Sequence, residues 1–300
     1  MTIKKIILKF YSFLIKFKKY LVSQSLKLIS NIFQLFFLRF NKSGLENEIE
    51  INRSNLKKID TFIDIDDYNS SSDNYGLPKY ILKFIDKELG SYPTYSDLQL
   101  FLAKNINKKI TYVEIGVSVL KNFYQMLSGT SENYFFAFDR NAINKNIAKN
   151  FKLAKSENNV IQYTYNKNKI TYFIGDVFDL NNLQEFRKIV NKANFIFSDA
   201  HHSYDGLISE YNFLIKYILD DDFILYYDDL KGELSNAFFE IKNCINTDFP
   251  NYENIYAYTF LINGWMGRNE KMHRNGIISN IDIELILKKE KIKLFNFKKI

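Results

Sequence analysis

The chain has 300 residues, of which 46% are hydrophobic, so it is long enough to bury one large core or two smaller ones. The single cysteine, Cys244, excludes an intrachain disulfide and a cysteine-rich zinc cluster and suits a reducing, cytoplasmic compartment. The net charge of +7 is concentrated in residues 1–45, which contain basic side chains and no acid. The remaining residues lack the positive field of a nucleic-acid binder, so we do not expect nucleic acid as a partner.

Residues 1–45 form a basic amphipathic segment. Lysines recur every three to five residues on one helical arc, and apolar side chains cover the other side, among them Ile6, Phe10, Phe13, Phe17 and Leu21. The longest charge-free run, residues 28–38, is too short to span a bilayer, which takes about 20 residues. Two alternatives remain for this helical segment. It lies on an anionic membrane surface through residues 1–40, or its apolar face packs on the body of the protein or on another subunit of a homo-oligomer.

Residues 46–75 are polar and end in "DDYNSSSDNYG", which is typical of a linker. The pattern then becomes an alternation of helices and strands, and it predicts one domain over residues 76–300. We expect helices near 78–89 and 96–105, followed by five strand–helix units. Their strands are 109–116, 133–139, 169–176, 193–199 and 222–229, and their helices are 119–128, 141–155, 181–191, 204–219 and 233–246. Further strands are expected near 254–262 and 277–287. This order predicts an α/β fold with a Rossmann-like, doubly wound, mostly parallel sheet and an N-terminal helical extension.

An acidic residue stands at the end of each of the five predicted parallel strands, namely Glu114, Asp139, Asp176, Asp199 and Asp228. Ligands of such sheets bind outside the carboxyl ends of the strands, so these acids are candidates for a binding site. A carboxylate at the end of the second strand can accept hydrogen bonds from both hydroxyls of a ribose, which favours Asp139 as a nucleoside ligand. The alternative is that each acid caps the helix that follows it.

Five segments occur in a diagnostic order: "YVEIG" (112–116), "FAFD" (136–139), "IGD" (174–176), "DAHHSYDGLISE" (199–210) and "LYYDD" (225–229). This order resembles class I S-adenosylmethionine-dependent methyltransferases over about residues 108–230. It is most similar to small-molecule and sugar O-methyltransferases that carry a D-G-x-H-x-Y motif, the methyltransferase domain 24 type. Asp199, His202, Tyr204 and Glu210 fall on positions of that motif, whereas His201 occupies its variable position.

The resemblance implies which residues bind S-adenosylmethionine: Glu114, Gly116 and Ser118 at the first loop, Asp139 at the ribose, Asp176 at the adenine amine, and Asp199. It also implies that Asp199, Asp228 and Asp229 hold Mg²⁺ or another divalent metal, because few positive charges compensate these three carboxylates. For a hydroxyl acceptor, His202 or His273 would act as the base, with Asp199 beside it. The two histidines of "DAHHSY" have an alternative local use, in helix capping and loop packing.

The first loop departs from the family pattern. Family members carry a second glycine and a Ser or Thr after the first motif, whereas this chain has Leu120 and Asn122 there. Leu120 makes the loop bulkier where backbone and cofactor would meet. The rival for such a sheet, a dehydrogenase, requires G-x-G-x-x-G after the first strand, and "GVSVLKN" contains one glycine.

The segment "NGWMGRNEKMHRNG" (263–276) is glycine-rich and holds the only tryptophan of the chain. We expect it to form an acceptor-binding lid. Trp265 would stack on a sugar or aromatic acceptor, and Arg268, Glu270 and His273 would bind hydroxyls or a charged group. The alternative is an ordinary hairpin loop.

Together these features predict an S-adenosylmethionine-dependent methyltransferase that acts on a hydroxyl of a small molecule or a sugar. Two alternatives stay open at this point. One is a metal-dependent hydroxylase on the same scaffold, and the other is a non-catalytic, membrane-attached interaction protein whose cofactor loop is closed by Leu120.

Overall fold

The computed structural model describes residues 44–57, 90, 92–106, 108–118, 120–264 and 272–300, which belong to a unit that begins at Gly44. Residues 1–43 of the basic amphipathic segment and the predicted helix at 78–89 lie outside the described residues. Within the described part of the chain, no helix combines the length and the apolar character needed to cross a bilayer.

Five strands form the parallel centre of one ten-stranded sheet, in the order β5-β2-β1-β6-β7. They are β1 (Thr111–Ile115), β2 (Tyr134–Asp139), β5 (Asn168–Ile174), β6 (Ala193–Ser198) and β7 (Leu219–Tyr227). Antiparallel strands extend both sides: β9 (His273–Ser279), β8 (Tyr256–Ile262) and β10 (Phe295–Lys299) beyond β7, and β4 (Val160–Tyr165) and β3 (Lys152–Glu157) beyond β5.

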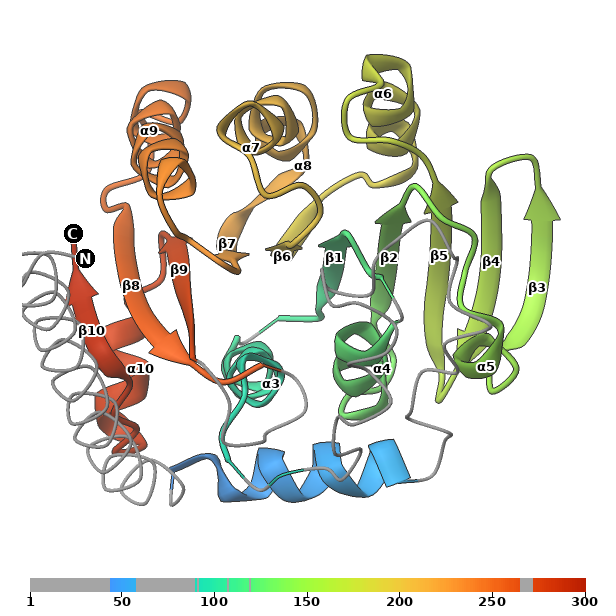
Figure 1. The fold of residues 1–300 in the computed structure, drawn as a ribbon, viewed down its shortest axis with the longest axis horizontal. Coiled ribbons are helices and arrows are strands. Elements are labelled where there is room, and N and C mark those ends of the chain that lie inside the picture. The colour runs from blue at the N-terminus through green and yellow to red at the C-terminus, as the bar shows by residue number, and fades with distance from the viewer. Residues whose placement is uncertain (1–43, 58–89, 91, 107, 119, 265–271) are drawn as a thin grey trace, which may run out of the picture. The chain divides into compact units, whose positions relative to one another are not determined.

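Helices cover both faces of this sheet (Figure 1). One face carries α3 (Tyr95–Asn105), α4 (Lys121–Ser128) and the short α5 (Lys145–Ala148). The other carries α6 (Leu180–Ile189), α7 (Tyr204–Glu210) with its continuation α8 (Lys216–Ile218), and α9 (Glu233–Asp248). A π-helical turn, Tyr211–Ile215, joins α7 to α8, and α10 (Ile283–Lys289) precedes β10. The expected Rossmann-like, doubly wound, mostly parallel sheet is therefore confirmed, with antiparallel strands added at both edges.

Three predicted elements were wrong. Instead of a helix over 141–155, only α5 is helical, and β3 and β4 form a hairpin that continues the sheet edge. Asn158 lies at the turn of this hairpin and Asn166 and Lys167 at the next one, all with positive φ, so the chain reverses in tight turns there. The strand expected at 277–287 ends at Ser279, and α10 follows. Residues 46–57 are not part of a linker, because residues 44–57 form a helix with Leu45, Ile49 and Leu56 buried.

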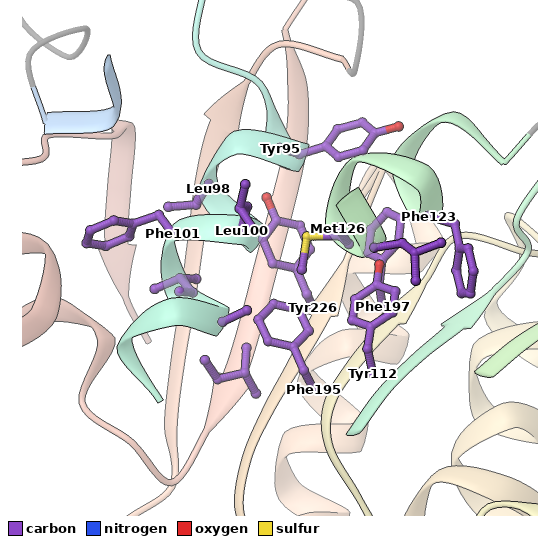
Figure 2. Close-up of a cluster of buried hydrophobic side chains, with 14 of the residues drawn as sticks. Tyr95, Leu98, Leu100, Phe101, Tyr112, Phe123, Met126, Phe195, Phe197 and Tyr226 are labelled. Atoms are coloured by element: carbon purple, nitrogen blue, oxygen red, sulfur yellow. The ribbon is translucent and has the colours of Figure 1, made fainter. Parts of the chain in front are cut away.

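Apolar side chains alternate between two cores, one on each face of the sheet. On the face of α3 and α4, aromatic side chains of neighbouring strands pack in a continuous row, with ring centroids 5.6 Å apart for both Tyr112–Phe195 and Phe197–Tyr226. Figure 2 shows these rings beneath Leu98 and Met126 of the two helices. Each fully buried large side chain contributes about 1.5–3 kcal/mol, so this row fixes α3 and α4 on the sheet.

A buried ion pair attaches the helix over 44–57 to α3. The guanidinium of Arg53 donates to both carboxylate oxygens of Asp97, at 3.1 and 3.0 Å, and also to the carbonyls of Gly90 and Tyr92. Asp97 is fully buried and completes the capping box of α3 by accepting from the N–H of Thr94 at 2.9 Å. One carboxylate thus joins the cap of α3 to the preceding helix.

We predict that Arg53→Ala lowers the free energy of unfolding by about 3–5 kcal/mol, because it leaves the Asp97 carboxylate buried without its cation. Lys104→Ala is the matched control, since Lys104 pairs with Glu48 between the same two helices at 3.5 Å but is partly exposed. That variant should lose no more than about 1 kcal/mol. Urea unfolding measures both, and equal losses would contradict the assignment.

Candidate functional site

The sheet order brings the five predicted acids to adjacent strand ends. Asp139 is the last residue of β2, Asp199 and Asp228 directly follow β6 and β7, Glu114 is the penultimate residue of β1, and Asp176 follows β5 by two residues. Because β5, β2, β1, β6 and β7 are neighbours and parallel, all five lie along one edge of the sheet, as expected from the sequence.

The loops after β1 and β6 meet at Gly116. A Cβ at this position would lie 2.4 Å from the Cα of Ala200 and 2.5 Å from the carbonyl oxygen of Asp199, and φ is +84°. The backbone N–H of Asp199 donates to the carbonyl of Ile115 at 2.8 Å, and that of Gly116 donates to Phe138 at 2.8 Å. Only glycine allows this approach, so Gly116 serves the contact between two site loops.

Asp139 is held by the backbone on both sides. One carboxylate oxygen accepts from the N–H of Ser118 at 2.8 Å, and the other accepts from that of Asn141 at 2.8 Å. Burial raises the pKa of Asp139, although the hydrogen bonds from Asn141 and Ser118 oppose the shift. The carboxylate is therefore fixed in direction by the loops after β1 and β2.

Glu114 points into the protein. Its side chain lies on the same face as Tyr112, is 1% exposed, and accepts from the hydroxyl of Tyr112 at 2.6 Å and the amide of Asn122 at 2.8 Å. Burial raises the pKa of Glu114 to about 8. Glu114 thus holds the first turn of α4 through Asn122. The sequence motif does not predict this role.

Leu120 does not fill the loop. It has φ of +65°, and its side chain is fully buried in the core on the α3 and α4 face. The steric objection to a cofactor at the first loop is therefore removed. Asn122, the other departure from the family pattern, is the residue that donates to Glu114.

Asp176 is exposed and accepts from the backbone N–H of Phe178 at 2.9 Å. The Phe178 ring is 49% exposed and packs edge-on against His201, with ring centroids 4.6 Å apart. His201 also pairs with the hydroxyl of Ser203 at 2.8 Å, in agreement with a local role. The sequence analysis did not include Phe178 among the site residues, although an aromatic residue in a polar loop could have indicated that it belongs there.

The loops after β6 and β7 and the start of β9 bring carboxylates and two histidines together. Nε2 of His202 lies 3.0 Å from Asp199, and its Nδ1 lies 4.0 Å from Asp229. Nδ1 of His273 lies 3.2 Å from Asp228 and 3.6 Å from Asp229. We call these five residues the acid–histidine array. Its members come from three segments, and His273 is the first residue of β9.

The array contains its own positive charges. The hydrogen bond to Asp199 raises the pKa of His202 to about 9, and the one to Asp228 raises the pKa of His273 to about 9. Lys231 pairs with Asp229 at 2.6 Å. Burial acts to raise the pKa of Asp229, but the hydrogen bond from Lys231 and the charge of His273 lower it overall. The three carboxylates are therefore compensated, contrary to the expectation on which the metal site was based.

The three predicted metal ligands do not form a set with the spacing of one ion among the described residues. The set with suitable spacing is Asp228, Asp229 and His273, which each place one ligand atom within 4.8 Å of the others. Asp199 is not in this set; it pairs with His202, whose Nδ1 lies 4.0 Å from Asp229. The close partners of Asp228 were also missed: Asn275 donates to its carboxylate, and the hydroxyl of Tyr226 donates to Asn275 at 2.8 Å. Asn275 could have been recognised in the sequence as a polar residue that precedes the apolar residues of β9.

Glu210 lies beneath the array. It is fully buried, accepts from the hydroxyl of Ser198 at 2.6 Å, and its Oε1 has no hydrogen-bond partner within the described residues. Burial raises the pKa of Glu210 to about 8. Tyr204, by contrast, is at the surface and bonds to Glu240. The predicted acceptor-binding residues Trp265, Arg268 and Glu270 lie outside the described residues.

No protein-family model and no curated protein matches the chain. Among solved structures, the O-methyltransferase from Bacillus cereus in complex with SAH is 12% identical, with a TM-score of 0.43 over 79% of this chain and 90% of that chain. Aeropyrum pernix fibrillarin with natively bound S-adenosyl-L-methionine is 10% identical, with a TM-score of 0.36 over 61% and 73% of the two chains. MycE, a methyltransferase of the mycinamycin pathway solved with Mg, SAH and mycinamycin VI, is 11% identical, with a TM-score of 0.31 over 43% of this chain. This chain spans 30% of the length of MycE. These likenesses are too distant to assign an activity.

We predict that Gly116→Ala destabilises the protein more than Gly232→Ala. Both glycines have positive φ, so both variants lose about 1–3 kcal/mol to backbone strain, but nothing lies within 4 Å of a Cβ at Gly232. At Gly116 the overlap with the backbone of Ala200 should cost about 1–3 kcal/mol more. Urea denaturation of the two variants gives the difference, and equal losses would show that the loops do not need this contact.

We predict that Glu210→Gln flattens the pH dependence of stability. The pKa of about 8 in the folded protein exceeds the usual value of about 4.3. The proton on Glu210 therefore stabilises the fold fully below about pH 4, and this contribution is lost as the pH rises through 8. Between pH 5 and 8 the wild type should lose stability relative to the variant, by at most about 1.4 kcal/mol per pH unit, and the difference should level off above the pKa of about 8.

Glu185→Gln, at an exposed position of α6, is the control and should follow the wild type. Denaturant unfolding across this pH range measures all three proteins. Parallel curves for wild type and Glu210→Gln would contradict a protonated Glu210 in the folded state.

Proposed function

We propose that the chain is an S-adenosylmethionine-dependent methyltransferase that acts on a hydroxyl of a small molecule or a sugar. One observation carries the proposal: Asp139 and the acid–histidine array lie at strand ends on the two sides of β1, and the end of β1 contacts both. The backbone N–H of Ser118 donates to Asp139 at 2.8 Å, and the N–H of Asp199 donates to Ile115 at 2.8 Å. The carboxylate that we assign to a nucleoside therefore lies near the groups to which we assign the proton chemistry.

The residues at the first loop fit the cofactor. The oxygens of Asp139 are held in place by the backbone N–H groups of Ser118 and Asn141, and we assign this oriented carboxylate to the ribose hydroxyls. Asp176 is exposed at the next strand end, where it would accept from an adenine amine. Leu120 leaves the loop clear. When bound, S-adenosylmethionine would supply an electrophilic methyl group.

Glu114 would act through its neighbours. Because its carboxylate is enclosed by Tyr112 and Asn122, we assign it to holding the first turn of α4 below the cofactor loop. Gly116 would likewise act by letting the loops after β1 and β6 approach each other. Ser118 would present its loop to the cofactor while its N–H holds Asp139.

The acid–histidine array would supply the proton chemistry. Methyl transfer to a hydroxyl releases a proton, and an imidazole with a carboxylate partner can accept it in its neutral form. Because the pKa of His202 and of His273 is raised to about 9, that form increases as the pH rises toward 9. Asp199–His202 and Asp228–His273 both have this arrangement. A divalent ion would occupy Asp228, Asp229 and His273 if it bound, and no step above requires it.

The test is calorimetric titration of the full chain with S-adenosylmethionine, without added metal. We expect binding, and we expect Asp139→Asn to weaken it about 10- to 100-fold, since a hydrogen bond to a charged group contributes about 1.5–3 kcal/mol. Asp179→Asn is the matched control, because Asp179 is a nearby exposed aspartate that caps α6 and asparagine caps equally well.

The control should bind as the wild type does. Absence of binding at millimolar cofactor would reject the methyltransferase proposal. If Asp139→Asn binds the cofactor as well as the wild type does, Asp139 does not bind the ribose, and only the proposal that the chain binds S-adenosylmethionine remains.

A further inference from the structure

The sheet edge formed by β3 carries a positive patch. The segment from residue 140 to residue 155, which contains α5 and the first part of β3, holds five basic side chains and no acid. They are Arg140, Lys145, Lys149, Lys152 and Lys155, and together with Leu153 we call them the α5–β3 patch. Residues 46–300 hold all 34 acids of the chain and 32 of its 41 bases. The patch is therefore a positive region in a part of the chain that is otherwise acidic.

The charges of the patch are exposed, and most of them are uncompensated. Lys155 pairs with Glu157 at 2.8 Å, and both side chains of this pair are more than half exposed. The other four bases are exposed and form no ion pair with any residue that the structure describes. Clustered charges of one sign create a potential that attracts partners of the opposite sign. The patch is therefore suited to an anionic partner.

An apolar side chain lies among these charges. β3 is the outermost strand of the sheet beyond β4, and all six of its residues are exposed (Figure 1). Leu153 lies opposite Tyr163 of β4, so the two side chains point to the same face of the sheet. Tyr163 packs against Phe151, which follows α5, with ring centroids 5.9 Å apart. Leu153 is thus on the face that carries α5, and it is 58% exposed.

The bases flank the strand on both faces. Lys145 and Lys149 are four residues apart in helical spacing, with a backbone hydrogen bond of 3.0 Å between them, so they lie on one side of α5. Lys152 and Lys155 lie opposite residues of β4 that neighbour Tyr163, so they point to the other face of the sheet. A broad anionic surface that meets the edge of the sheet can contact both pairs of lysines and Leu153 between them.

The composition of the patch distinguishes between classes of anionic partner. Lysines attract the headgroups of an anionic bilayer, and an exposed aliphatic side chain beside them can enter the interface. A single-stranded nucleic acid is held by exposed aromatic rings on which its bases stack. Within the described residues 140–155, the one aromatic side chain is that of Phe151, which is buried. The patch therefore has the chemistry of a lipid-binding surface.

We propose that the α5–β3 patch docks the protein on the surface of an anionic lipid bilayer, with Leu153 inserted among the headgroups. The patch is separate from the acid–histidine array, because β3 and β7 are seven strands apart in the order of the sheet. The inference does not depend on the methyltransferase proposal, and its test uses no cofactor.

The test is sedimentation of the full chain with phosphatidylglycerol vesicles and with phosphatidylcholine vesicles. We expect partition onto the anionic vesicles that weakens as salt is added. The triple variant Lys145→Glu/Lys149→Glu/Lys152→Glu should lower the partition coefficient about 100-fold, since each lysine near an anionic surface contributes roughly fivefold. Leu153→Ser should lower it about fivefold, because an inserted leucine side chain is lost. The wild type and all variants keep residues 1–43, so the contribution of that segment is the same in each.

Two matched controls separate the patch from charge and hydrophobicity in general. Lys188→Glu/Lys289→Glu/Lys298→Glu makes the same change in net charge at exposed lysines elsewhere. Leu285→Ser removes an exposed leucine of α10, which is 63% exposed. Both controls should retain most of the affinity of the wild type. Equal losses in the patch variants and the controls would overturn the proposal, as would a wild type that does not bind phosphatidylglycerol vesicles.

Two further measurements test the other anionic or edge-binding partners. Tighter binding of the wild type to oligouridylate than to phosphatidylglycerol vesicles at the same salt concentration would assign the patch to nucleic acid. Sedimentation velocity without vesicles would show a change of oligomeric state in the triple variant if β3 paired with a second copy of the chain. Either result would overturn the lipid assignment. We expect weaker binding to oligouridylate and an unchanged oligomeric state.

Discussion

The candidate site depends on the close contact of two backbone segments at the centre of the sheet. Gly116 lies against Ala200 at a distance that admits no side chain, and the hydrogen bond from Asp199 to Ile115 joins the same loops. The parallel order of the strands places the loop after β1 and the loop after β6 at the same end of the sheet, and this contact holds the two loops against each other. Ser118 of the first loop holds Asp139, and the second loop begins the acid–histidine array.

The acidic residues at the strand ends differ in burial and in the groups that pair with them. Asp139 is held in one orientation by the backbone N–H groups of Ser118 and Asn141. Glu114 and Glu210 are enclosed on opposite faces of the sheet, and burial raises the pKa of each to about 8. Each accepts hydrogen bonds from residues that lie next to the site, Glu114 from Asn122 and Glu210 from Ser198. The carboxylates of the array are neutralised by the array's own histidines and by Lys231. A site of this kind is preorganised, which is what transfer chemistry requires of its surroundings.

The sequence predicted features that depend on a single strand and the residue at its end. It did not predict contacts between segments that are distant in the chain. Buried apolar runs followed by acids predicted the five parallel strands and the acid at the end of each. The hairpin of β3 and β4 was missed because a helix was expected over 141–155, whereas β3 begins at Lys152 and its pairing with β4 depends on a turn beyond that range. The pairing of His273 with Asp228 requires β9 to insert antiparallel between β7 and β8, which no local pattern contains. For the same reason the compensation of the three carboxylates could not be foreseen.

The central claim is that one edge of the sheet binds a nucleoside cofactor beside a proton acceptor. A crystal structure of the full chain with S-adenosylhomocysteine tests it most directly. The account predicts the ribose hydroxyls within hydrogen-bond distance of Asp139, and the homocysteine sulfur on the side of the rim that carries the acid–histidine array. A ligand bound elsewhere, or a ribose that does not contact Asp139, would contradict it.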